Sequence, residues 1–177
     1  MRVLAKLTLI ITFTLLGGSM AANAANVTQR RTVAAYRVEL HITALEPFFS
    51  KQEVVDKHVK KGMEIVGGAA PIAMDAASHP NRHLAVYIFR RRSRQVVTDA
   101  TVAISFVPID AKGRANGAPI DVPVVVMQEI GKGPASTRYG NNVTMPAGRY
   151  NVTVMIKGKR LVFVVALTDA SAGHMKM

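Results

Sequence analysis

The chain has 177 residues, no cysteine and a formal net charge of +12. This length is enough to bury the core of one domain. The lack of cysteine excludes disulfide bonds, thiolate metal sites and thiol nucleophiles, and the positive charge favours anionic partners.

The first residues have the order of a secretory signal peptide. Arg2 and Lys6 form a positive start, and residues 7–16 are an uncharged apolar run too short to span a bilayer. Small residues follow, so cleavage is predicted after Ala24, and an uncleaved anchor is the alternative. We therefore expect a periplasmic domain, 25–177, with no transmembrane segment after cleavage. Since an exported protein rarely meets nucleic acid, none is expected among its partners.

Two elements are predicted in the first third of the mature chain. Residues 32–43 alternate between apolar and polar side chains, which is typical of a half-buried strand. Ser50 and Glu53 have the spacing of a capping box and predict a helix over 50–61. Gly62 would take the left-handed position that ends this helix.

The rest of the chain is predicted to be strands and loops. Residues 67–82 are rich in Gly, Ala and Pro and are expected to form a long loop. With the first strand, the pattern predicts a single all-β domain: an immunoglobulin-like antiparallel β-sandwich of about seven strands with one short helix. The later strands are expected at 83–89, 96–107, 120–128, 142–145, 150–156 and 160–168.

Two turns near the end of the chain have specific features. Lys157-Gly158-Lys159 separates two alternating segments, so it predicts a tight hairpin. Tyr150 follows a Pro/Gly turn at the start of a late strand. This placement fits a tyrosine corner, whose hydroxyl bonds the preceding loop, and an ordinary core tyrosine is the alternative.

Histidine and methionine supply the candidate metal ligands. Imidazole suits copper and iron, and thioether favours copper(I). His83 begins a predicted strand, His79 precedes it in the loop, and Met127 ends another predicted strand. A turn role for His79 and core packing of Met127 are the alternatives. The candidate site is therefore His83, Met127 and His79, with copper or iron as the metal.

A cluster of arginines is the other candidate site. Arg90, Arg91, Arg92 and Arg94 lie between two alternating segments. A solvated hairpin turn is one interpretation, and a patch that binds an anion or a partner is the other. No nucleophile–base pair, phosphate loop or dinucleotide fingerprint is visible, so the protein is not expected to be an enzyme.

Several short segments together resemble one known family. The resemblance, over 83–156, is to the periplasmic iron-transport proteins that accompany ferrous permeases. It implies an immunoglobulin-like sandwich that binds copper or iron, often as a homodimer. The segments are His83-Leu84-Ala85-Val86, Met127, Arg138-Tyr139-Gly140-Asn141-Asn142-Val143 and Pro146-Ala147-Gly148-Arg149-Tyr150.

Within this resemblance, His83 and Met127 correspond to metal ligands. The chain departs from the family pattern at two positions: Ala85 stands where the family has a glutamate, and Arg138 where it has a histidine. Arginine cannot ligate a metal because it stays protonated. The sequence thus supports two functions: an exported, non-catalytic protein that binds copper or iron, or a module that docks on an envelope protein through its basic loops.

Overall fold

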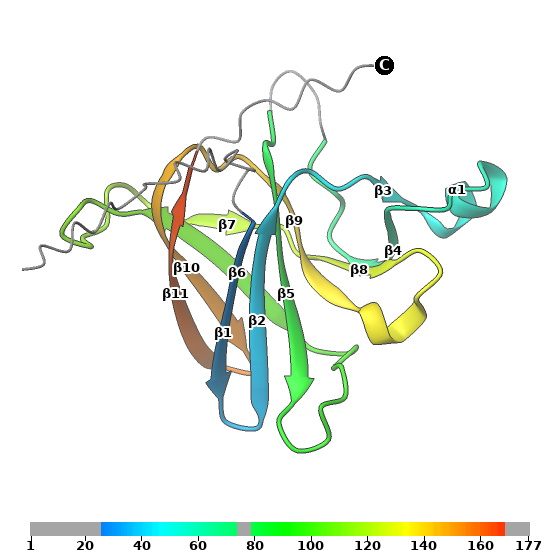
Figure 1. Cartoon of the computed structure of the whole chain (residues 1–177), viewed down its shortest axis with the longest axis horizontal. Helices are drawn as coiled ribbons and strands as arrows, with labels where there is room; N and C mark the ends of the chain where they lie inside the picture. Colours follow the sequence, from blue (N-terminus) through cyan, green and yellow to red (C-terminus); the bar gives the residue numbers. More distant parts are fainter. Residues whose placement is uncertain (1–25, 74–78, 169–177) are drawn as a thin grey trace, which may run out of the picture.

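The computed structural model describes residues 26–73 and 79–168, so the predicted signal peptide lies outside the described residues. The chain is an all-β sandwich, as predicted, with two sheets and one short α-helix (Figure 1). The strand count differs from the prediction, because the described chain forms seven strands in one sheet and four in the other.

The seven-stranded sheet has the order β1-β2-β5-β9-β8-β4-β3. All its pairs are antiparallel except β3–β4, which is parallel. Its strands are β1 (Val27–Val33), β2 (Tyr36–Thr43), β3 (Phe48–Phe49), β4 (Met63–Gly68), β5 (Arg82–Arg90), β8 (Val125–Glu129) and β9 (Arg138–Val143).

The second sheet is antiparallel and has the order β11-β10-β6-β7. Alternate side chains of both sheets meet in one core, in which Leu40, Val86 and Phe163 are buried. The other side chains of β2 and β5 therefore point away from this core, onto what we call the outer face of the seven-stranded sheet. The strands of the second sheet are β6 (Val102–Pro108), β7 (Ile120–Val122), β10 (Gly148–Ile156) and β11 (Lys159–Leu167).

Two predicted strands are each divided in the structure. Residues 32–43 contain a two-residue turn at Ala34–Ala35, with Val33 paired to Tyr36 across it. Residues 120–128 are split at Pro123 into β7 and β8, which belong to different sheets. A proline cannot donate to a ladder, so the chain leaves one sheet there and enters the other.

The helix prediction is confirmed at its start and wrong at its end. In α1 (Lys51–Asp56), Ser50 caps the helix and Glu53 completes the capping box. The helix ends early because His58, with φ of 49°, takes the left-handed position expected for Gly62. The His58 N–H bonds the Val55 carbonyl and the next N–H bonds the Val54 carbonyl, which is a Schellman motif.

The predicted loop over 67–82 is shorter at both ends. Its first two residues belong to β4, and its last residue begins β5. Gly68, the last residue of β4, lies close to the backbone beside it: a Cβ at this position would lie 2.4 Å from the Val124 carbonyl oxygen. The hairpin at Lys157-Gly158-Lys159 is confirmed, with Ile156 paired to Lys159 across a tight turn.

Candidate functional site

Three turns that are distant in sequence meet at one end of the sandwich (Figure 1). Tyr36, which follows the Ala34–Ala35 turn, pairs with Arg90 at the end of β5. The Lys157 ammonium lies 6.0 Å from the centre of the Tyr36 ring. This contact places the β10–β11 turn beside the β1–β2 turn and the arginine turn. We call the group Arg90, Arg91, Arg92, Arg94, Lys157 and Lys159 the basic end.

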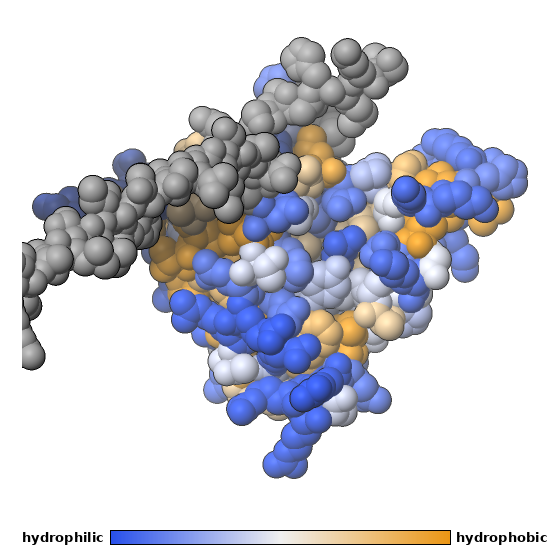
Figure 2. Space-filling model, in the orientation of Figure 1, coloured by the Kyte–Doolittle hydropathy of each residue, from blue (hydrophilic) through white to orange (hydrophobic). Residues whose placement is uncertain are grey.

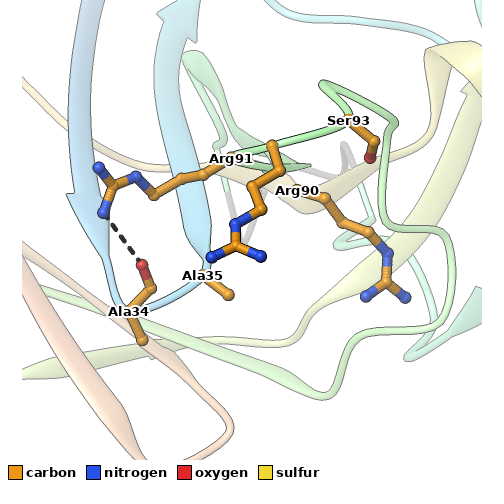
Figure 3. Close-up of a pocket in the computed structure, with 6 residues that line it drawn as sticks. Ala34, Ala35, Arg90, Arg91 and Ser93 are labelled. Carbon is orange, nitrogen blue, oxygen red and sulfur yellow. Dashed lines mark hydrogen bonds between the residues drawn. The ribbon is translucent and has the colours of Figure 1, made fainter.

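The backbone of the arginine turn is held firmly while its side chains stay exposed. The Arg94 N–H donates to the Arg90 carbonyl, and the Arg91 N–H donates to the Ala35 carbonyl, both at 2.8 Å. The Arg91 guanidinium also reaches the Ala34 carbonyl at 3.4 Å. A hollow of about 690 Å³ lies between these two turns. Figure 3 shows that the side chains of Arg90 and Arg91 point away from one another.

Within the described residues, no ion pair neutralises the charge of the basic end. The end is hydrophilic in Figure 2, at the lower part of the view. The structure therefore brings together the four arginines predicted from sequence and adds Lys157 and Lys159. Only the basic composition of their predicted hairpin could have pointed to them.

His83 lies on the outer face and is 1% exposed. Its Nδ1 is 3.1 Å from the Asn142 side-chain oxygen, which also accepts from the Glu46 N–H at 3.4 Å. Because that oxygen is an acceptor, His83 Nδ1 is the protonated nitrogen and Nε2 carries the lone pair. Nε2 is buried and has no hydrogen-bond partner in the described part of the chain.

The surroundings of His83 disfavour its charged form. Burial is the largest cause and the positive charge of Arg138 the second; together they lower the pKa of His83 to about 4, although its hydrogen bond to Asn142 opposes the shift. His41 on β2 is close enough to contribute in the same direction. The pKa of His41 is itself lowered, mainly by burial, although Glu39 beside it opposes this. Both rings are therefore neutral at pH 7.

The structure does not gather the three predicted metal ligands. His83 pairs with Asn142 on β9, whereas Met127 pairs with Arg138, four positions away along that strand. Four positions correspond to about 13 Å, whereas metal–ligand bonds are about 2.0–2.3 Å long. His79 is exposed in the loop before β5, and its carbonyl accepts from the Thr144 hydroxyl. Across the described residues, no group of three or more His, Cys, Asp or Glu could hold a metal.

Met127 and Arg138 have other contacts. Met127 is fully buried with Met63 and Val125 in a small second core. It therefore has the core-packing role that the sequence offered as the alternative to metal binding. The Arg138 guanidinium contacts the Met63 sulfur and lies 5.6 Å from the centre of the Tyr87 ring. The positively charged Arg138 therefore occupies the position at which the resemblance implies a metal ligand.

Comparison with known proteins adds no relative. The sequence matches no family model, and neither a curated protein nor a solved structure matches it significantly. Of the helices in the described ranges, none is long and apolar enough to cross a membrane.

Proposed function

We propose that the protein is an exported, non-catalytic module that docks on the acidic surface of an envelope protein through its basic end. The observation that carries this proposal is the meeting of six cations from two distant turns, and none of these cations forms an ion pair with another described residue. Periplasmic localisation rests on the signal-like order of residues 1–24.

The spread of the side chains suits an extended partner. Arg90 and Arg91 diverge from their turn (Figure 3), so each can contact a separate carboxylate. Their backbone is already ordered by hydrogen bonds, so binding need fix only side chains. Such a surface accelerates association with an acidic partner, and its contribution weakens as salt screens the charges.

The test uses the mature protein, 25–177, and poly-L-glutamate as a probe for an acidic protein surface. Binding is expected at about 0.05 M NaCl and loss of most of it by about 0.3 M. Arg91→Glu with Arg92→Glu should weaken it more than about tenfold. The matched control is Lys112→Glu with Arg149→Glu, which makes the same change in net charge at the opposite end of the sandwich. Equal losses in the two double variants would refute a defined docking surface.

Metal binding is the second candidate, and the observation that favours it is the state of His83. The Nδ1–H of His83 is oriented by its hydrogen bond to Asn142, and Nε2 has no partner among the described residues. Histidines that ligate metals have the same arrangement, with one ring nitrogen hydrogen-bonded and the other free to bind the metal. Copper or iron would be the metal, and the homodimer that the resemblance implies would accompany it. Titration of the mature protein with copper(I) and iron(II) tests this. Binding no tighter than that of a His83→Ala, Met127→Ala double variant would eliminate it.

A further inference from the structure

A second hollow, separate from the basic end, lies on the outer face. It is formed where the turn after α1 meets the last residue of β8 and the first residue of β9. Its volume is about 360 Å³, within the range of small-molecule sites. Five charged residues line it: Lys60 and Lys61 from the turn, Arg138 from β9, Glu46 before β3, and Glu129 from β8.

The charges of this hollow favour an anion. The Glu129 carboxylate is already paired with the Lys132 ammonium at 2.5 Å. Of the remaining lining charges, three are cations and one is the Glu46 carboxylate, so the net charge is 3 − 1 = +2.

Arg138 differs from the other arginines of the outer face. Arg30 and Arg37 both pair with Glu39, at 2.7 and 3.3 Å. Arg138 is partly buried, yet its guanidinium faces only a thioether and an aromatic ring among the contacts described above. Its Nε is buried and lacks a hydrogen-bond partner within the described residues. A partly buried guanidinium without an anion is costly, and a carboxylate is the group that its fork geometry fits best.

We propose that this hollow binds a small organic carboxylate, with Arg138 as the bidentate contact and Lys60 and Lys61 completing the positive rim. Met63 and Ile130, which also line the hollow, offer apolar surface to the carbon chain of the ligand. The site does not depend on the basic end, because none of its residues belongs to that group.

The Arg138 side chain supplies a direct reporter of binding at this site. A carboxylate bound to the guanidinium should shift the NMR signals of that side chain, whereas an anion bound at the basic end should leave them unchanged.

The experiment titrates the mature protein with succinate, acetate and inorganic phosphate by NMR and calorimetry. Succinate should bind with a dissociation constant of about 1 mM or tighter, and its saturation should shift the NMR signals of the Arg138 side chain. Arg138→Gln should weaken binding at least about tenfold. Arg138→Lys keeps the positive charge but cannot make the two parallel hydrogen bonds of a guanidinium, so its affinity should be intermediate. The matched control Arg149→Gln removes an exposed arginine and should bind like the wild type.

Three results would overturn the proposal. One is the absence of succinate binding to the wild-type protein. The second is binding that leaves the NMR signals of the Arg138 guanidinium unchanged, a readout that requires no variant to fold. The third is phosphate binding more tightly than succinate. The Arg91→Glu, Arg92→Glu variant should bind succinate normally, so failure of the docking proposal and failure of this one are distinguishable.

Discussion

The hydroxyl of Tyr150 donates a hydrogen bond of 2.9 Å to the carbonyl oxygen of Pro146, four residues earlier in the chain. Tyr150 is 5% exposed and packs edge-on against Phe106 in the core. The bond therefore fastens the loop before β10 to the interior. The tyrosine corner expected from sequence is confirmed, and Tyr150 is at the same time a core residue.

Tyr150→Phe should keep this packing and lose the bond. The free energy of unfolding is expected to fall by about 0.5–1.5 kcal/mol, because the Pro146 carbonyl loses its partner. Urea unfolding followed by circular dichroism measures it. Tyr36→Phe is the control, since no hydrogen bond of its hydroxyl occurs in the described structure, and it should change stability by less than about 0.5 kcal/mol. Equal effects would mean that the corner does not stabilise the loop.

Gly140 is required where β5 and β9 pair on the outer face. A Cβ at this position would lie 1.9 Å from the Leu84 carbonyl oxygen and 2.7 Å from the Ala85 Cα. These are backbone atoms, so Gly140→Ala should push the strands apart and cost more than about 3 kcal/mol. The control is Gly67→Ala, where nothing lies within 4 Å of an added Cβ. Thermal melting of both variants checks this, and a stable Gly140→Ala protein would contradict it.

The sheet strands were predictable where alternation is regular. The interiors of β2, β10 and β11 follow period two, so their faces could be assigned without a structure. The turn at Ala34–Ala35 was missed because alanine is not a turn former, although Ala34 adopts φ of 48°. Pro123 is visible in the sequence, but the apolar residues on both sides of it favoured the prediction of one continuous strand over 120–128.

The candidate sites were predictable only in part. The arginine cluster is contiguous in sequence, so it needed no tertiary information. The position of Lys157 beside it depends on how the two sheets pack, which no local pattern encodes. The hollow at Arg138 joins segments that begin at Glu46 and end nearly a hundred residues later. The resemblance marked Arg138 as the position of a missing ligand, whereas in the described structure Arg138 contacts Met63 and Tyr87 and forms no ion pair.

His83 should make the protein sensitive to acid. Its pKa in the folded state is about 4, below its ordinary value of 6.5. As the pH falls from 6.5 towards 4, the unfolded chain therefore takes up a proton that the folded chain does not. The free energy of unfolding should fall by about 1.4 kcal/mol per pH unit, or about 3 kcal/mol in total. The lowered pKa of His41 acts in the same direction.

Urea unfolding at several pH values between 7 and 4 measures this slope. His83→Gln should be less stable at pH 7 and should show a flatter dependence on pH, because the titrating group is gone. His58→Gln, which removes an exposed histidine, should keep the wild-type slope. An unchanged slope in His83→Gln would show that other groups, such as His41, cause the acid sensitivity.

A Lys157→Glu variant tests whether the residues of the basic end bind a partner as one surface. Lys157 is 66 positions from Arg91 in sequence, yet both residues lie against the β1–β2 turn region, Lys157 near Tyr36 and Arg91 at Ala34. Lys157→Glu should therefore weaken poly-L-glutamate binding by about three- to tenfold and reduce its salt dependence, and Arg91→Glu is expected to do the same. Lys112→Glu changes the net charge equally but lies beyond the other end of β6, so it should have less than about half of this effect on the binding free energy. Affinity measured at two salt concentrations separates the cases. If Lys157→Glu and Lys112→Glu behave alike, binding follows net charge and the three turns do not form a common docking surface.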